Sequence, residues 1–465
     1  MLISMRPGPP LARGLALVEQ IESLLYGRGG SSACDATDVG LQPWISDAQA
    51  DLEFDLTGAA TPAAGAIFPL YDGSPGEDAR DAALLDRRMP RLQLARATEA
   101  GFTILAEGVP ANERPWLLQA GREAVATRLT TLARACVRTK GRPLSMAGVA
   151  PAARRRLPEL FVAGALAGRV RARLGRLLAH EGHWRVGWRA CAAGEGALDR
   201  LEWPRAAWTW LPDDRRRYFA DPFLFEHGGQ VFVFCEEFPY STAKAVISVF
   251  TLDAQGRPTA PRVVLDRPYH LSYPLVFRHE GQIWMMPESS TRRTLELYRA
   301  DPFPDRWVLD RILLEGLEIS DATPFETGGR HFLTAATSDD GGSSWDCLSL
   351  FSGPGPLGPW TRCGDGPALV DASAARPAGR VEKRGDSLWR PAQDCTRGYG
   401  SGLALCRIES VSEDGFSQTV AARLRPPSGA PPEGVHTLNS GAGFETIDAV
   451  GPRGRWKTPD QGDGS

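Results

Sequence analysis

The fold is decided by the segment ADPFLFEHGGQVFVFCEEF (residues 220–238), in which a Gly-Gly turn separates two apolar runs. Three later segments align on the same turn: SYPLVFRHEGQIWMMPESS (272–290), SDATPFETGGRHFLTAATS (320–338) and ARPAGRVEKRGDSLWRPAQD (375–394). The turn recurs about every 50 residues, at Gly229, Gly281, Gly329 and Gly385. A repeat of this length, built from strand, turn and strand, is typical of a β-propeller.

We therefore predict a mainly β protein in which residues 184–450 form a five-bladed, furanosidase-like β-propeller, although four or six blades also fit the spacing. Intervening runs such as AVISVFTLD (245–253) supply the outer strands of each four-stranded blade. The fifth blade is expected to combine SGLALCRIESVSE (401–413) with GVHTLNSGAGFETIDAV (434–450), closed by RAAWTWL (205–211).

Residues 1–145 are predicted to form a small, degenerate α/β domain. We expect helices over 14–26 and 115–137, and strands in DLEFDLTG (51–58) and RLQLARATEAGFTILAEG (91–108). Residues 146–183 read as a basic linker helix, and 451–465 as a disordered tail. The arginines within 152–178 favour either weak docking on an anionic membrane or a surface helix that packs its Leu stripe on protein.

Composition excludes several classes of function. A net charge of -3 gives no electrostatic case for nucleic acid. The eight cysteines are scattered without a Cys-x-x-Cys pair, so we expect no metal and no cofactor. The N-terminus lacks the apolar core of a signal peptide, and this predicts a cytoplasmic protein, peripheral at the inner membrane if the basic helix docks there.

The repeat also predicts a polar site. Each hairpin turns at its glycine and returns, so residues before its first strand and after its second strand lie at the same end. The predicted catalytic residues are Asp221, Asp321 and Glu288, and the predicted substrate-binding residues are Glu237, His270, Tyr273, Arg376, Arg390 and Asp394. Three carboxylates can serve as base or nucleophile, as acid, and as a group that tunes the acid. Taken singly, each acid also fits a structural cap of a turn.

The same segments resemble a known family. The runs that carry the resemblance are RRYFADPFLFEHGGQVFVFCEEF (216–238), DRPYHLSYPLVF (266–277), WMMPESS (284–290), LELYRADPFPDRWVLDR (295–311), ISDATPFE (319–326), ARPAGR (375–380), WRPAQDC (389–395) and GVHTLNS (434–440). They are similar to the N-terminal propeller domain of glucosamine inositolphosphorylceramide transferases and its bacterial relatives, some of which carry a formyltransferase-like region in front. The resemblance implies a fold similar to arabinanases and xylosidases, and a reduced formyltransferase-like region in residues 1–145.

Three functions compete on these grounds. The first is an enzyme, either a glycosyltransferase or related to glycoside hydrolases, that acts in surface polysaccharide or glycolipid biosynthesis. The second is a non-catalytic module that binds a sugar, glycan or sugar phosphate and partners a separate glycosyltransferase. The third is a scaffold that uses its rim for protein contact. Acids and arginines converging at one end favour the first two, and an arginine pair suits a phosphate or uronate.

Overall fold

The computed structural model describes residues 2–3, 18, 53–55, 65–99, 101–139, 143–147, 161, 163–164, 182–427 and 432–453. The chain divides into two compact units: unit 1 comprises Met1–Leu174 and Asp339–Ser343, and unit 2 comprises Gly175–Ser338 and Ser344–Ser465. The predicted helix 14–26, the basic helix 152–178 and the tail fall outside the described residues, apart from isolated positions. Among the residues described, no helix is long and apolar enough to span a membrane.

The described residues of unit 1 form a mixed sheet with two helices. Its strands are β1 (Leu2–Ile3), β2 (Glu53–Phe54), β3 (Ile67–Tyr71), β4 (Ser74–Pro75), β5 (Leu92–Thr98), β6 (Gly101–Gly108) and β7 (Ser145–Ala147), in the order β1-β2-β3-β5-β6-β7 with β4 paired to β3. The helices are α2 (Glu77–Leu85) and α3 (Leu118–Arg138). Strands β5 and β6 and helix α3 confirm the elements predicted at 91–108 and 115–137.

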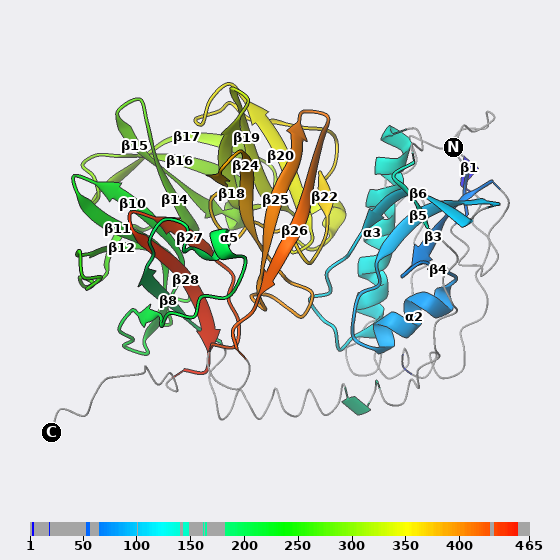
Figure 1. The fold of residues 1–465 in the computed structure, drawn as a ribbon, viewed down its shortest axis with the longest axis horizontal. Coiled ribbons are helices and arrows are strands. Elements are labelled where there is room, and N and C mark those ends of the chain that lie inside the picture. Colours follow the sequence, from blue (N-terminus) through cyan, green and yellow to red (C-terminus); the bar gives the residue numbers. More distant parts are fainter. Residues whose placement is uncertain are drawn as a thin grey trace. The chain divides into compact units, whose positions relative to one another are not determined.

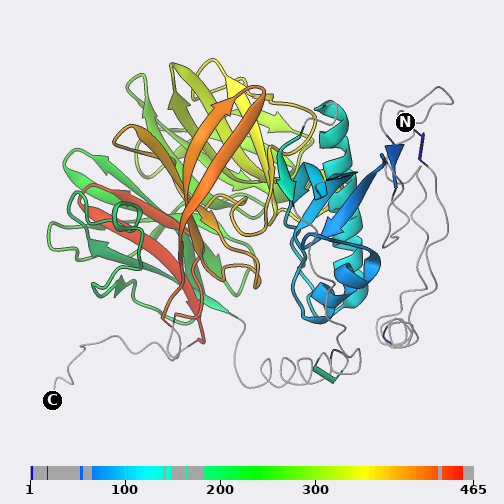
Figure 2. The same cartoon turned by 45° about the vertical axis from the view of Figure 1, so that its right-hand side comes forward.

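Helix α3 buries the apolar stripe that the sequence predicts. Val125, Leu132 and Cys136 recur at helical spacing and join Leu94 and Leu105 of the sheet in one core. Both Figure 1 and Figure 2 show α3 running alongside β5 and β6.

Unit 2 contains five antiparallel sheets among the described residues (Figure 1). The first sheet is β10 (Arg217–His227), β11 (Gln230–Pro239), β12 (Val246–Leu252) and β13 (Arg262–Leu265); the second is β14 (Ser272–His279), β15 (Gln282–Ser289), β16 (Thr294–Ala300) and β17 (Trp307–Glu315). The third is β18 (Ile319–Thr327), β19 (Arg330–Thr337), β20 (Cys347–Gly353) and β21 (Thr361–Arg362), with β22 (Leu369–Val370) also paired to β20. The fourth is β23 (Glu382–Arg384), β24 (Ser387–Gln393), β25 (Leu403–Ser412) and β26 (Gly415–Leu424). The fifth is β27 (Leu438–Gly441), β28 (Phe444–Gly451), β8 (His183–Ala190) and β9 (Thr209–Trp210), with the short helix α5 (Ala197–Arg200) between β8 and β9.

The fifth sheet differs from the prediction in one respect. The run 401–413, expected there, instead forms β25 and pairs with β24 in the fourth sheet. Its place beside β28 is taken by β8, whose ladder runs from Ala190 opposite Phe444 to His183 opposite Gly451. Strands from the beginning and the end of the unit thus share one sheet, so neither β8 nor β28 is left as an open edge. The predicted closing run 205–211 does contribute, through β9.

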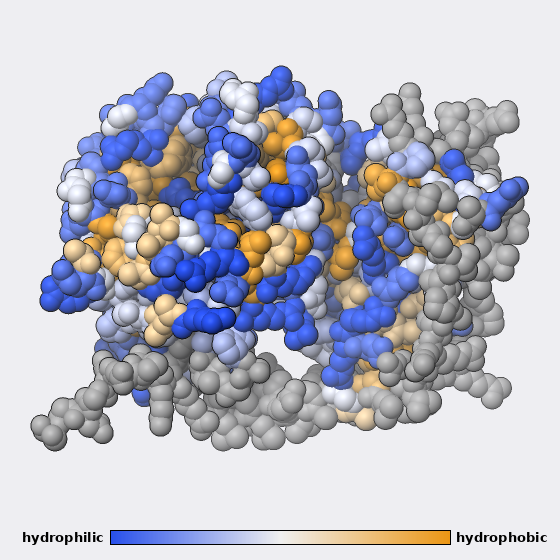
Figure 3. All heavy atoms as spheres, viewed as in Figure 1, coloured by the Kyte–Doolittle hydropathy of each residue, from blue (hydrophilic) through white to orange (hydrophobic). Residues whose placement is uncertain are grey.

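Neighbouring sheets bury their facing sides against each other. Phe234 and Ile247 of the first sheet pack with Val276 and Met285 of the second. The other side of the second sheet, including Leu297, packs in a separate core with residues of the third. Because both sides of a sheet are buried, its strands read as nearly continuous apolar runs. On the face drawn in Figure 3, hydrophilic side chains predominate and hydrophobic ones gather in separate areas.

Candidate functional site

The site begins with an irregularity shared by the first strands of three sheets. The register shifts between Ala220 and Phe223, between Ser272 and Leu275, and between Ser320 and Thr323. At each shift one residue other than glycine adopts a positive φ: 50° at Asp221, 45° at Tyr273 and 56° at Asp321. This left-handed backbone costs an ordinary residue about 1–2 kcal/mol, and strain of this kind concentrates at functional sites.

Carboxylates hold the three strained backbones in place. The Asp221 amide donates to Asp448 Oδ2 at 2.9 Å, the Tyr273 amide to Asp221 Oδ2 at 3.1 Å, and the Asp321 amide to Glu288 Oε2 at 3.2 Å. In each case the acceptor lies in the sheet that precedes the donor's sheet along the chain, except that the donor in the first sheet has its acceptor in the fifth. The acids therefore link neighbouring sheets around one centre.

A cavity of about 140 Å³ lies at this centre. Its lining is mostly polar and comprises Trp184, Tyr218, Ala220, Asp221, Glu236, His270, Ser272, Glu288, Asp321, Arg376, Tyr399 and His436. Five predicted site residues are thereby brought together: Asp221, Glu288, Asp321, His270 and Arg376. The other four, Glu237, Tyr273, Arg390 and Asp394, do not line the cavity.

Glu237 and Tyr273 are buried in contacts between strands. Glu237 accepts hydrogen bonds from Arg217 and from Ser248, both at 2.6 Å, because its side chain projects to the face of β11 opposite that of Glu236. The Tyr273 hydroxyl lies 2.9 Å from Thr323 Oγ1 and accepts from the Gly379 amide at 2.8 Å. Glu237 thus joins strands of the first sheet, and Tyr273 joins the second sheet to the third, and neither side chain lines the cavity.

Arg390 and Asp394 support the loops around the cavity. Arg390 donates to the carbonyls of Ala374 and Ala375, which fixes the chain just before Arg376. Asp394 accepts from Arg425 at 2.6 Å and from the Thr396 hydroxyl at 2.6 Å. It thereby anchors the loop that carries Tyr399. The predicted arginine pair for a phosphate is not formed, because Arg390 is committed to backbone carbonyls.

Arg376 is the single arginine among the lining residues, and it is paired. Its Nε donates to Asp321 Oδ2 at 2.6 Å, and Gln393 Nε2 donates to the same oxygen at 3.3 Å. Burial opposes the charge of Arg376, but the Asp321 carboxylate raises the pKa of the guanidinium well above its ordinary value. The ring of Tyr399 covers this guanidinium at 5.1 Å. Asp321 therefore neutralises the arginine inside the site.

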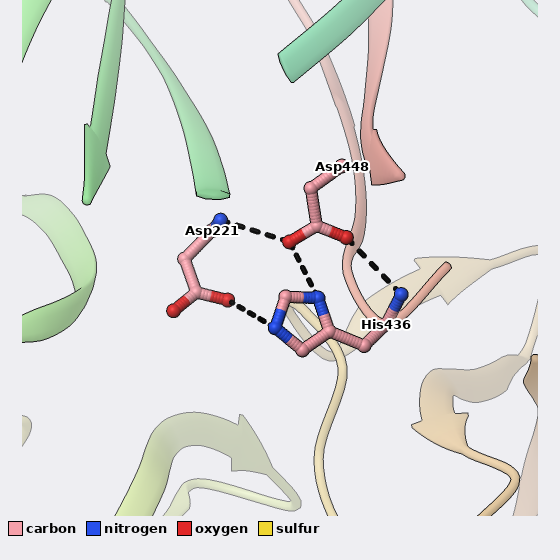
Figure 4. A group of neighbouring side chains, drawn as sticks. All are labelled: Asp221, His436 and Asp448. Carbon is pink, nitrogen blue, oxygen red and sulfur yellow. Dashed lines mark hydrogen bonds and ion pairs between the residues drawn. The ribbon is translucent and has the colours of Figure 1, made fainter. Parts of the chain in front are cut away.

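Sequence reasoning missed His436, which lies beside Asp221 (Figure 4). Its Nδ1 is 2.6 Å from Asp448 Oδ2 and its Nε2 is 3.7 Å from Asp221 Oδ1. Burial works against a charged imidazole, yet Asp448 and Asp221 raise the pKa of His436 to about 9. Trp184 stacks on the imidazole with ring centroids 4.1 Å apart. The signal was present in GVHTLNS (434–440), which leads into a glycine turn at Gly441–Gly443 between β27 and β28, but this turn was not aligned with those of the other four segments.

The lining also holds a second histidine, His270, and the aromatic ring of Tyr218. His270 Nε2 lies 3.4 Å from Glu236 Oε1, and although burial counteracts it, this carboxylate raises the pKa of His270. Tyr218 donates to Glu236 at 3.3 Å and stacks on Phe238, with ring centroids 4.8 Å apart. Aromatic faces beside carboxylates are the combination that sugar rings and their hydroxyls require.

Asp221, His436 and Asp448 also meet the distance condition for a metal site, since one ligand atom from each lies within 4.8 Å of the others. A bound ion would hold neighbouring ligand atoms roughly 3 Å apart or more. The 2.6 Å contact between Nδ1 and Asp448 Oδ2 is instead that of an imidazolium ion-paired with a carboxylate. The histidine itself thus supplies the positive charge between the two acids.

Comparison with known proteins identifies relatives of part of unit 2. Residues 213–427 match the family model described as glucosamine inositolphosphorylceramide transferase 1, N-terminal. Proteins named glucosamine inositolphosphorylceramide transferase 1 from Oryza sativa subsp. japonica and Arabidopsis thaliana are 33% and 31% identical over 205 residues, which is 43% of this chain. The resemblance to this N-terminal domain family is thereby confirmed for the matched segment. The chain spans only 27% of the length of these relatives.

Solved structures with similar folds include carbohydrate-cleaving enzymes. The family 117 glycoside hydrolase Zg3597 of Zobellia galactanivorans matches with a TM-score of 0.37 and 11% identity, over 57% of this chain and 90% of that one. An exo-1,5-α-L-arabinanase from a bovine ruminal metagenomic library matches with a TM-score of 0.35 and 15% identity, over 52% and 95%.

Proposed function

We propose that unit 2 is a five-bladed, furanosidase-like β-propeller whose cavity binds a sugar, glycan or sugar phosphate. The protein would act in surface polysaccharide or glycolipid biosynthesis, by glycosyl transfer or chemistry at a glycosidic bond. The observation that carries this proposal is convergence: strands of the sheets, or loops next to them, bring polar side chains from all five sheets to one cavity. These side chains include Asp221, Glu288, Asp321, Arg376 and His436.

The proposed base or nucleophile is Asp221. Burial raises its pKa to about 7, with His436 opposing that shift, so its carboxyl group can exchange a proton near neutral pH. The proposed partner acid is Asp321 or Glu288. Glu288 accepts a hydrogen bond from Ser290 at 2.7 Å besides the one from the Asp321 amide, and its side chain is half-buried.

A non-catalytic binding module is the second candidate. It is favoured by the number of structural contacts that the acids already make. Both oxygens of Asp221 are occupied, by the Thr437 hydroxyl at 2.8 Å and by the Tyr273 amide at 3.1 Å. Asp321 is ion-paired with Arg376. Carboxylates fixed in this way can still accept hydrogen bonds from sugar hydroxyls without transferring a proton.

The partner proposed for the binding module is a separate glycosyltransferase, because the relatives are named transferases and extend well beyond the matched segment. The proposed weak contact of residues 152–178 with an anionic membrane would make the protein cytoplasmic and peripheral at the inner membrane. Co-sedimentation with anionic vesicles at low salt, with release at high salt, tests that contact.

A thermal-shift screen against nucleotide sugars, sugar phosphates and short glycans tests the site. A ligand that binds only the folded state raises the melting temperature. We expect a shift in the wild type and in Asp365→Asn, since Asp365 is exposed and lies outside the cavity lining, and none in Asp221→Asn. If Asp221→Asn keeps the full shift, the cavity is not the sugar site.

Product analysis separates the two candidates. Turnover of a ligand found in the screen, lost in Asp221→Asn and retained in Asp365→Asn, would establish the enzyme. Binding without turnover in the wild type would leave the binding module.

A further inference from the structure

We propose that His436, positioned by Asp448, is the catalytic proton donor of the cavity. This inference rests on the proposed glycosidic chemistry and deepens it, because it moves the acid role from a third carboxylate to a histidine. His436 lies in the segment that leads into β27, and its imidazole is among the groups that line the cavity.

Asp448 is built to orient this ring. It is fully buried on β28 and accepts three backbone amides: those of Asp221 at 2.9 Å, His436 at 3.1 Å and Thr437 at 2.9 Å. Its Oδ2 also lies 2.6 Å from His436 Nδ1. Figure 4 shows this carboxylate between the backbone of Asp221 and the imidazole. With Nδ1 engaged, Nε2 is the nitrogen that points toward Asp221.

The other candidates for the acid are less suited to it. Asp321 receives Nε of Arg376 and the Gln393 amide on Oδ2. Burial raises the pKa of this carboxyl well above its usual value and Arg376 opposes that shift, but the ion pair holds this oxygen against the guanidinium and not against a leaving group. Glu288 accepts hydrogen bonds on both oxygens, from the Ser290 hydroxyl and the Asp321 amide. Both oxygens of Glu288 are therefore already engaged in the resting site.

The charges around His436 favour its protonated form. Asp448 faces it from β28, and Asp221 faces it from β10. Asp321 of β18 adds a more distant negative charge, and Arg376, which is paired with Asp321, is the nearby positive group among the lining residues. Trp184 and Tyr399 cover the ring, with centroids 4.1 and 5.1 Å away, and limit its access to water. The proton is therefore retained at neutral pH.

The step closes without an outside donor. As the bond between the sugar carbon and the leaving oxygen breaks, its electron pair stays on that oxygen, which takes the Nε2 proton of His436. Because Nε2 and Asp221 Oδ1 lie 3.7 Å apart, the incoming hydroxyl approaches on the same face as the leaving oxygen; it forms the new carbon–oxygen bond and passes its proton to the Asp221 carboxylate. Asp221 then returns this proton to His436 Nε2, which lies 3.7 Å from its Oδ1 in the resting site. Both groups are restored for the next cycle.

The test compares leaving groups. Wild type, His436→Gln and His331→Gln are assayed on 2,4-dinitrophenyl, 4-nitrophenyl and methyl glycosides of common pentoses and hexoses. His331 is a matched control, because it lies opposite Glu326 in the ladder of β18 and β19, close to their turn and away from Asp321. A methyl leaving group needs a proton to depart, whereas dinitrophenolate leaves without one.

We expect His436→Gln to lose about 10²–10⁴-fold in kcat/KM on methyl glycosides. The loss on dinitrophenyl glycosides should be only a few-fold, and His331→Gln should match the wild type. Equal losses on both leaving groups, or no loss, would overturn the role of His436 while the proposed function stands. If the wild type turns over none of these glycosides, proton transfer by His436 is overturned together with the hydrolytic form of the proposed function.

A second measurement does not need a substrate. Nitrogen-15 NMR of the full chain labelled at histidine, with His436 assigned by the signal missing in His436→Gln, should show both ring nitrogens protonated at pH 7.5. Asp448→Asn should move that titration to lower pH, as expected for a positioning residue. An imidazole that is neutral at pH 7.5 in the wild type would overturn the proposal.

Discussion

In the first three sheets of unit 2, the first strand has left-handed backbone at its cavity end, and the turn that follows it has left-handed backbone as well. Different residues adopt this conformation at the two places. At the turn ends, Gly229, Gly281 and Gly329 adopt φ values of 75°, 77° and 71° with open space around them. At the cavity ends, the same conformation is held by Asp221 and Tyr273, which are buried, and by their counterpart Asp321. Glycine reaches this region without strain. Side chains are therefore kept at the cavity ends for the contacts that they make, since the backbone alone would favour glycine.

The largest effect is expected where one side chain supports several strained or buried groups. Asp448→Ala removes the acceptor of three buried amides and the partner of His436. Breaking one side of a buried ion pair costs about 3–5 kcal/mol. We expect a loss of that size in the free energy of unfolding, measured by urea denaturation. A loss below about 1 kcal/mol would mean that the contacts at the cavity end stabilise the fold no more than those of an ordinary surface residue.

The second test uses pH. The folded-state pKa of His436, about 9, lies above the unfolded value of about 6.5, so the stability it contributes is complete below pH 6.5 and is lost as pH rises to 9. We expect the difference in unfolding free energy between wild type and His436→Gln to shrink across this window. The raised pKa of Asp221 acts in the same direction, but between about pH 4 and 7. A difference that stays constant from pH 6.5 to 9 would contradict an ion-paired imidazolium.

The turn ends were predictable from the sequence because glycine reports a backbone requirement directly. The spacing of Gly229, Gly281 and Gly329 placed the hairpins, and apolar runs placed the strands around them. The convergence of Asp221 and Asp321 followed from the same geometry.

The rest of the site depends on contacts between distant segments. Glu237 projects to the face of β11 that meets Ser248, and Arg390 binds two backbone carbonyls. Strand pairing and packing set both arrangements, and the spacing of the repeat does not predict them. His436 was missed because its sheet is completed by β8, some 250 residues earlier in the chain, and the hairpin of β27 and β28 that follows it was not aligned with the other four turns. Positive φ at Asp221 carries no sequence signal at all.

Tyr273 tests whether every cavity-end side chain serves the site. Tyr273→Phe leaves the buried Gly379 amide without the hydroxyl that accepts it. An unsatisfied buried group costs about 1–3 kcal/mol, so we expect that loss in unfolding free energy. The ligand-induced shift in melting temperature should persist, because Tyr273 does not line the cavity. Loss of the shift at unchanged stability would restore the role in substrate binding that the sequence predicts.

The smallest effect is expected at the turn end, where the requirement is purely one of backbone. Gly329→Ala places a Cβ in open space at a φ of 71°, so its cost is conformational and amounts to about 1–2 kcal/mol. Gly415 of β26 is the matched control, since its Cβ would also meet nothing within 4 Å and its φ is not positive. Gly415→Ala should therefore be neutral or slightly stabilising in the same urea titration. Equal losses in the two variants would show that the left-handed backbone is not what distinguishes the turn glycines. The strain assigned to Asp221 and Asp321 would then lose its energetic basis, because it rests on the same conformational cost.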